Sequence, residues 1–547
     1  MKNLHRITIL YLTIPFILFL FGWVKLSIAI PLVMILLFAI WQFIKQSPAS
    51  SLKSPTPQPF DKAQGRSPVP NLQSPIPQSS NSRITVYCLL ITASWVFLSG
   101  VGGYAFQNWD HHWRNAVLHD LINYDWPVFY STPESGPVKM LVYYVGYWLP
   151  SALIGKLLGW QVANFFLFLW TWLGVILVTL HLASALKTSP IKAILLLIFF
   201  SGMDALGTLF LAPEYPTLLP AVTHLEIWSG SLQYSSFTTQ LFWVFNQAVP
   251  AWLCIALILD NGVIARSALV LRDEAIPSLS GRLLQADDHR LRNDEKILFW
   301  SLCFFFAPLA SIGLLPYILI QTIKQIDFKS PFKNLRPNIL LVSAGMIFLL
   351  SSFFFSANTA AQSRGFQSLA LKDFLTFFLL EGGILWLLLA PVKWRDPRWM
   401  VTGLLLAIIP FIQLGSGMDF VMRASIAPLF YLMMMVGEVI FQNTSPRILR
   451  FTLYALLLLG SLTPLYEINR SVYRTFESYV VLDGMIYSQP GSEPVTHLEQ
   501  GGAPELEHPL TLNADEIKTL QYMNDKLSKN FIANVRQSLY YRYIAPR

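Results

Sequence analysis

The amino-acid sequence predicts an all-α, polytopic membrane protein with about 13 transmembrane helices. Of its 547 residues, 54% are hydrophobic and only 13% are charged, whereas soluble domains carry roughly 25% charged residues. Apolar runs, most of them long enough to cross a bilayer core of about 30 Å, recur from residue 7 to residue 466. A soluble fold cannot bury this much apolar surface. The composition therefore excludes a cytosolic enzyme, a nucleic-acid-binding protein and a secreted module.

The N-terminal part of the chain divides at a change of composition. Apolar segments at 7–24 and 27–44 predict a transmembrane hairpin over residues 1–45. Basic residues precede the first segment and no small-residue cleavage site follows it, so we expect an uncleaved anchor. Residues 46–83 are rich in Pro, Ser and Gln and cannot bury enough apolar area to offset their ordering entropy. They predict a disordered cytoplasmic linker.

Residues 84–466 form the predicted membrane core. Its apolar runs lie at 84–103, 141–157, 161–186, 191–212, 237–260, 298–323, 338–356, 373–392, 400–414, 425–441 and 451–466. The run 141–157 contains Gly, Pro and Lys, which favours an interfacial or re-entrant segment. Pro308 and Pro316 interrupt the run 298–323, which predicts a hairpin of two short helices. The mixed-charge residues 261–296 predict a solvated cytoplasmic insertion.

The distribution of Lys and Arg predicts the orientation. If the linker is cytoplasmic, the basic residues concentrate in the cytoplasmic connections, as the positive-inside rule requires. We therefore attribute the net charge of +8 to this bias rather than to an acidic partner. The polar residues 467–547 then form a small extracytoplasmic C-terminal region, in which residues 514–543 predict a helix.

Signatures of soluble enzymes are missing from the sequence. It contains no Walker A loop, no dinucleotide-binding fingerprint and no His-Glu-x-x-His motif. The three cysteines lie within apolar runs and provide neither a disulfide framework nor a paired metal or redox motif. We predict no cofactor; a divalent metal is compatible with the sequence but is not predicted.

The first cluster of unusual residues follows the run 84–103. In a helix, Asp110 and Arg114 share a face because they are four residues apart. A carboxylate beside a guanidinium and imidazoles at a membrane surface suits a general base with an adjacent anion site. An interfacial amphipathic helix in an aromatic belt is the alternative. A metal site made of Asp110, His111 and His112 would need a non-helical turn, because adjacent helical residues point in different directions.

The second cluster spans residues 213–236 and contains no Lys or Arg. It offers His224, Glu226 and Gln233 together with Trp and Tyr side chains. Aromatic faces with acidic and amide groups suit a sugar, whose C–H faces stack and whose hydroxyls need hydrogen-bonding partners. A loop lying on the lipid headgroups is the alternative.

Two further clusters lie at residues 415–425 and 357–372. Asp419 and Arg423 are four residues apart at the start of an apolar helix, where charges are costly unless they pair. They predict either a structural pair that caps the helix or a site in which Arg423 binds a lipid-linked phosphate. Residues 357–372 carry Arg364 and Lys372, and a plain loop is favoured there over a second phosphate contact.

The arrangement resembles the GT-C superfamily of integral membrane glycosyltransferases, which use polyprenyl-phosphate-linked sugars. Residues 84–103 look like the first core helix of that family, Asp110 falls where the catalytic acid of the first outer loop would, and residues 137–158 look like its interfacial helix. The strings QNWDHHWRNAVLHDLINYDWPV, LQYSSFTTQLFWVFNQAVPAWL and DFVMRASI look like marks of an uncharacterised bacterial branch. Asp110–His111 replaces the Asp-Glu pair of better-known members, so the resemblance implies neither a metal requirement nor a particular acceptor.

The resemblance implies an inverting transfer of a sugar from a polyprenyl-phosphate-linked donor to a glycan, lipid or protein acceptor outside the bacterial plasma membrane. Asp110 would deprotonate the acceptor hydroxyl, and Arg423 or Arg114 would stabilise the leaving phosphate. The expected partners are this lipid-linked sugar, the acceptor and membrane lipids, and not nucleic acid. The expected substrate-binding residues are His111, His112, Arg114, Asn115, Asp120, His224, Glu226, Gln233, Asp419 and Arg423.

A transporter or flippase of lipid-linked or polar solutes is the alternative function. Such a protein needs polar residues at mid-membrane on broken helices. Asp204, Asn246 and Glu381 are the candidates that the apolar runs contain. Mutations of loop carboxylates would impair a transferase, whereas mutations of these three residues would impair a transporter.

Overall fold

The computed structural model describes residues 2–46, 78–130, 139–211, 224–230, 232–273, 281–323, 338–358, 364–415, 418–442, 445–476, 530–534 and 538–546. Within these ranges, the side chains of residues 2, 46, 78–84, 112 and 260–293 are not described. Most of the predicted linker, and most of the predicted helix over 514–543, lie outside the described residues.

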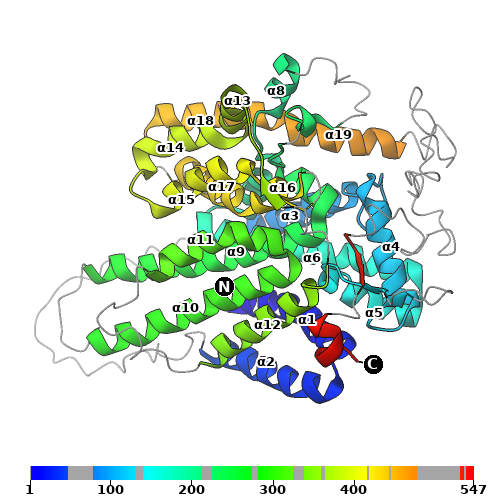
Figure 1. The fold of residues 1–547 in the computed structure, drawn as a ribbon. Coiled ribbons are helices and arrows are strands. Elements are labelled where there is room, and N and C mark those ends of the chain that lie inside the picture. The colour runs from blue at the N-terminus through cyan, green and yellow to red at the C-terminus, as the bar shows by residue number, and fades with distance from the viewer. Residues whose placement is uncertain are drawn as a thin grey trace, which may run out of the picture.

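Helices make up most of the described chain (Figure 1). The first half contains α1 (Lys2–Trp23), α2 (Leu26–Gln46), α3 (Gln78–Leu98), α4 (Asp110–Asn123), α5 (Leu149–Leu158), α6 (Trp160–Leu186), α7 (Pro190–Phe199), α8 (Asp204–Leu211) and α9 (Phe237–Asp273), with short 3-10 turns η1 (Val145–Tyr147) and η2 (Leu225–Ile227). The second half contains α10 (Gly281–Phe306), α11 (Pro308–Ile323), α12 (Ile339–Phe355), α13 (Leu371–Phe378), α14 (Ile384–Lys393), α15 (Pro397–Ile408), α16 (Asp419–Ala424), α17 (Ile426–Phe441), α18 (Arg447–Gly460) and α19 (Leu462–Phe476), with the π-helical turns η4 (Leu379–Gly383) and η9 (Tyr540–Ile544) and the 3-10 turn η5 (Ile409–Phe411).

Eight helical segments of the described chain are long and apolar enough to cross a membrane. They are Asn3–Trp23, Leu26–Lys45, Trp160–Leu186, Pro190–Leu211, Phe237–Leu259, Leu371–Lys393, Asp419–Phe441 and Arg447–Phe476. Five shorter apolar helices accompany them, among them α5, which with ten residues is too short to span. The prediction of a multi-pass helical membrane protein is confirmed, whereas the count of about 13 crossings stays a prediction.

The N-terminal hairpin packs against the core, although the linker separates the two in sequence. The Thr8 hydroxyl lies 3.0 Å from His181 Nε2 of α6. The Tyr11 ring stacks on Trp170 of the same helix with centroids 4.2 Å apart. Buried polar and aromatic contacts therefore attach α1 to α6, and the hairpin belongs to the same packed body.

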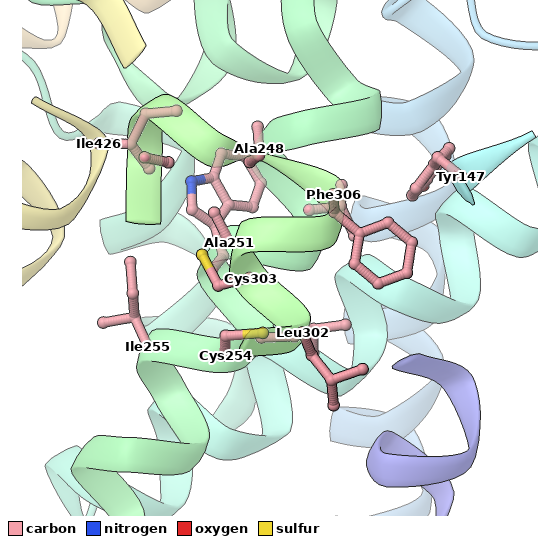
Figure 2. Packing of buried hydrophobic residues seen from close by; sticks show 14 of the residues in the cluster. Tyr147, Ala248, Ala251, Cys254, Ile255, Leu302, Cys303, Phe306 and Ile426 are labelled. Atoms are coloured by element: carbon pink, nitrogen blue, oxygen red, sulfur yellow. The ribbon is translucent and has the colours of Figure 1, made fainter. Parts of the chain in front are cut away.

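Helix α9 lies at the centre of this body, and α10 runs beside it (Figure 1). Figure 2 shows Ala248, Ala251 and Cys254 of α9 against Cys303 and Phe306 of α10, all of them fully or almost fully buried. Small side chains on α9 let its neighbours approach closely, which is the usual way in which helices associate in lipid. All three cysteines are buried and free, as their apolar surroundings predict.

Several of the membrane helices are broken. The predicted break at Pro308 is confirmed, because α10 ends at Phe306 and Pro308 begins α11. The other predicted break is wrong, since Pro316 lies inside α11, and α10 is not a short helix because it contains 26 residues. Residues 200–203 separate α7 from α8, and the π-helical turn η4 separates α13 from α14. Helix α9 kinks at Val244, whose φ and ψ of −135° and 35° are not helical. These breaks bring irregular backbone into the protein interior, where side chains and other backbone groups satisfy it.

Two small antiparallel sheets lie at the ends of helices. Strands β1 (Phe129–Tyr130), β2 (Lys139–Leu141) and β5 (Ile532–Asn534) form one sheet, and β3 (Arg364–Phe366) pairs with β4 (Ile412–Leu414) in the other. In the first sheet Leu141 lies opposite Ile532. The helix predicted over 514–543 is therefore wrong for residues 532–534, because they satisfy their backbone groups by pairing with β2.

Candidate functional site

A cavity of about 540 Å³ lies where α4, the kink of α9 and α16 meet the C-terminal strand. Its volume is within the range of small-molecule sites, which is roughly 300–1,000 Å³. Its charged and polar lining includes Asp110, Arg114, His224, Gln233, Asp419 and Arg423. Its aromatic lining includes Trp109, Trp113, Tyr143, Tyr144, Trp243 and Phe531.

Helix α4 presents the first ion pair of the cavity. Asp110 is the first residue of the helix, and Arg114 follows one turn later, with Nη2 3.1 Å from Asp110 Oδ2. The guanidinium also donates to Asn246 Oδ1 of α9 at 3.4 Å. The Arg114 side chain is 5% exposed, whereas the Asp110 side chain is 28% exposed. Both side chains line the cavity, and the carboxylate is the more accessible member of the pair.

Helix α16 presents a second pair with the same spacing. Asp419 begins the helix, and Arg423 Nη1 pairs with Asp419 Oδ1. The side-chain exposures repeat those of the first pair, 11% for the arginine and 30% for the aspartate. The predicted pairing of residues four apart is confirmed at both places, and the fold adds that both pairs face one cavity.

Tyr143 interacts electrostatically with both ion pairs. Burial raises the pKa of its phenol, the guanidiniums of Arg114 and Arg423 lower it, and Asp110 and Asp419 raise it again. Its ring also contacts Phe531 of the C-terminal segment, with centroids 4.4 Å apart. Tyr143 therefore stays a neutral phenol within the charged part of the cavity, where it can donate or accept a hydrogen bond.

A polar wall of the cavity is built by the segment before α9. Gln233 Nε2 lies 2.8 Å from Glu226 Oε2 and 3.2 Å from His224 Nε2. Glu226 is buried behind Gln233, where the Ser236 amide and the Thr239 hydroxyl also donate to its carboxylate. His224 and Gln233 thus reach the cavity, and Glu226 orients them from behind.

Buried charges tune the two titratable groups of this wall. Burial alone lowers the pKa of His224, but the carboxylates of Glu467 and Glu226 outweigh burial and raise it. Burial, followed by the Asp204 carboxylate, raises the pKa of Glu226 to about 7, although His224 lowers it. Glu467 is itself held by Trp243 Nε1 at 2.8 Å.

Besides Glu226, which lies behind Gln233, the structure places three predicted substrate-binding residues away from the cavity. His111 contacts the carbonyl oxygen of Phe242 at 3.0 Å, and Asn115 donates to Gln107 at 2.7 Å. Asp120 is fully buried and accepts a hydrogen bond of 2.6 Å from the Tyr130 hydroxyl. These contacts attach α4 to its neighbours.

The remaining predictions concern partly described segments. The side chain of His112 lies outside the described residues, as do residues 212–223, 359–363 and 416–417. Arg364 and Lys372 are exposed and do not line the cavity. Among the described side chains, no group of three His, Cys, Asp or Glu residues has the geometry to hold a metal ion.

The aromatic walls were missed by the sequence analysis. Trp113 stacks on Phe531 with centroids 5.2 Å apart and rings 4° from parallel, and Asn530 also lines the cavity. Trp113 carried a readable signal, because it lies three residues after Asp110 and one before Arg114 on α4, and Trp109 is the residue that precedes the helix. Phe531 carried none, since only the tertiary fold brings it to α4.

Comparisons with known proteins identify no relative. No family model matches the chain, and neither the curated proteins nor the solved structures contain a significant match.

Proposed function

We propose that the protein is a membrane glycosyltransferase that moves a sugar from a polyprenyl-phosphate-linked donor to a glycan, lipid or protein acceptor with inversion. One observation carries the proposal: two carboxylate–guanidinium pairs face the same aromatic-walled cavity. Carboxylates suit proton abstraction from a hydroxyl, guanidiniums suit a phosphate, and Trp and Tyr faces suit a sugar ring.

In the proposed reaction Asp110 accepts the proton of the acceptor hydroxyl. The hydroxyl oxygen forms a bond to the anomeric carbon, while the bond between that carbon and the phosphate oxygen breaks. The leaving phosphate takes the electron pair, and Arg423 stabilises its charge. Its guanidinium is nearly buried, so its interaction with the phosphate is weakly screened by water. His224 and Gln233 orient the sugar or the acceptor.

The proposed placement in the membrane follows the basic residues of the connections. It comprises about 13 crossings of a bacterial plasma membrane, a GT-C-like core and a cavity on the extracytoplasmic side. The pairing of β2 with β5 supports one part of this placement, because it requires the loop after α4 and the C-terminal strand to lie on the same side.

A substitution assay tests the proposal. Purified protein receives a pool of polyprenyl-phosphate-linked sugars, and mass spectrometry follows the release of free polyprenyl phosphate. Asp110→Asn should lower the rate by roughly 10²–10⁴-fold, the usual effect of removing a general base. Asp373→Asn, which changes an exposed carboxylate of α13 outside the cavity, is the matched control and should retain the rate.

The second aspartate makes the assignment of the base testable. If Asp419→Asn abolishes release and Asp110→Asn does not, the base is Asp419 and the roles of the two pairs are exchanged. If both variants release polyprenyl phosphate at the rate of the wild type, the cavity does not catalyse the transfer. Arg423→Gln should raise the KM for the lipid-linked donor, and it should also lower the rate of the chemical step.

Transport of lipid-linked or polar solutes is the second candidate, and a specific observation favours it. Asp204 and Glu381 are buried at breaks of two predicted membrane-spanning segments, as in transporters with discontinuous helices. Glu381→Gln should then abolish uptake into proteoliposomes while Asp110→Asn does not. The wild type would release no polyprenyl phosphate from any sugar donor.

A further inference from the structure

Two carboxyl groups meet in the protein interior behind the cavity. Asp204 begins α8 after the break at residues 200–203, and Glu381 lies in the π-helical turn η4. Their residues are 1% and 2% exposed. The amide of Met203 donates to the carbonyl oxygen of Leu380 at 2.9 Å, so the two helix breaks are joined directly to one another.

A single indole N–H serves both carboxyl groups. Trp228 Nε1 lies 2.9 Å from Glu381 Oε1 and 3.2 Å from Asp204 Oδ1. Asp204 also accepts a hydrogen bond of 3.1 Å from the Ser201 hydroxyl. The second oxygen of Glu381, Oε2, is buried and has no donor among the described residues.

Two glycines allow the backbone segments to pack closely at this junction. A Cβ at Gly202 would lie 2.6 Å from Glu381 Oε2, so the backbone of the α7–α8 break contacts the carboxyl group directly. A Cβ at Gly460 of α18 would lie 2.8 Å from the carbonyl oxygen of Ser201, which fixes the other side of the same break. Glu381 therefore has little room to turn its free oxygen toward another partner.

The surrounding charges do not balance two carboxylates. Neither Asp204 nor Glu381 forms an ion pair with any described residue. Besides Asp204, the groups that act electrostatically on Glu381 are Glu226 of η2 and the phenol of Tyr234, both acidic. Arg470 of α19 is paired with Glu467 instead. Two unpaired anions in this buried position would be strongly destabilising.

We infer that the junction of α8 with η4 is a proton-binding site, in which Asp204 and Glu381 together hold one proton. The proton resides on Glu381, because Asp204 accepts two hydrogen bonds near a helix N-terminus and Glu381 accepts one. Release of the proton leaves two anions around one indole N–H. The inference does not depend on the proposed transferase activity.

Infrared spectroscopy of the purified full-length protein tests the inference. A protonated carboxyl group in an apolar site has a carbonyl band that is separate from those of carboxylates and amides. At neutral pH the wild type should show this band, and ¹³C labelling of glutamate should shift it. Glu381→Gln, which imitates the neutral acid, should lose it. Glu226→Gln shows how much of the band comes from the neighbouring Glu226. Asp373→Asn, which changes an exposed carboxyl group, should leave the band unchanged.

Asp204→Asn provides an independent readout. Without the neighbouring anion, Glu381 should release its proton at a lower pH, so the band should titrate away earlier than in the wild type. This measurement and the isotope shift still decide the question if Glu381→Gln does not fold. The inference is overturned if the Glu226→Gln variant has no glutamic-acid band, or if the band is unchanged in both Glu381→Gln and Asp204→Asn.

Discussion

Phe531 provides the sharpest test of how the C-terminal strand closes the cavity. Its ring is 8% exposed and lies between Trp113 of α4 and Tyr143, with centroid distances of 5.2 and 4.4 Å. In Phe531→Ala, strand β5 loses both aromatic contacts and the buried apolar area of the ring. We therefore expect β5 to detach more often while the helices stay packed.

The size of the effect follows from this environment. Each aromatic pair contributes about 0.5–1.5 kcal/mol beyond its area, and truncation of a buried Phe to Ala typically costs about 3–5 kcal/mol. Since one side of the ring faces the cavity, the lower end of that range applies, about 3 kcal/mol. At about 1.4 kcal/mol per factor of ten, the detached population rises by roughly a hundredfold.

Residue-resolved hydrogen exchange measures this population. The amide of Val142 bonds to the carbonyl oxygen of Phe531 at 2.7 Å, whereas the neighbouring amide of Leu141 bonds to Val128 at 3.0 Å. Exchange at Val142 and at Ala533, which lies opposite Met140 in a hydrogen-bonded position, should accelerate by the same factor, while exchange at Leu141 should not change.

Two outcomes would refute this reasoning. If Val142 exchanges at the wild-type rate in Phe531→Ala, the aromatic contacts do not hold the strand. If Leu141 accelerates as much as Val142, the whole sheet opens rather than β5 alone. Leu539→Ala is the matched control, because this C-terminal side chain is 55% exposed and its loss should leave both amides unaffected.

Gly313→Ala should lower the melting temperature in detergent, because its Cβ would overlap the carbonyl oxygen of Ala424 and overpacking costs about 1–3 kcal/mol. The control Gly345→Ala has no atom within 4 Å of its Cβ and should raise the melting temperature slightly; equal behaviour of the two variants would contradict the packing of α11 on α16. Folding raises the pKa of Glu226 from 4.5 to about 7. The protonated side chain therefore contributes its full stabilisation below pH 4.5, and this stabilisation is lost as the pH rises through about 7. The loss is at most about 3 kcal/mol. Melting temperatures between these pH values should therefore fall less steeply in Glu226→Gln than in the wild type, and identical slopes would show that Glu226 is not perturbed.

Local geometry determined what could be predicted about the site. A helix places residues four apart on one face, so the pairs Asp110–Arg114 and Asp419–Arg423 follow from spacing alone. Their convergence on one cavity depends on how α4, α9 and α16 pack, and no local pattern contains that information. For the same reason Asp120 could not be recognised as a buried partner of Tyr130.

The predicted fold was limited in a similar way. Apolar runs predicted the membrane helices, and Pro308 predicted the break before α11 because proline cannot continue a helix with a normal hydrogen bond. The kink at Val244 lies six residues before Pro250, the proline of α9, and η4 contains no proline but the pair Gly382–Gly383, which is a weaker signal of a helix break. They depend on tertiary contacts, among them the bond from Met203 to Leu380.

The pairing of β5 with β2 has a consequence for the biogenesis of the protein. About 390 residues separate the two strands, so all helices from α5 to α19 are synthesised and inserted before β5 can reach its partner. Until then the nascent chain carries its two ion pairs beside a cavity that lacks Asn530 and Phe531. The pairing of β5 with β2 is therefore a late folding event, which follows the synthesis of the helices α5 to α19. A quality-control system that senses an unpaired edge at β2 would distinguish a finished molecule from an unfinished one.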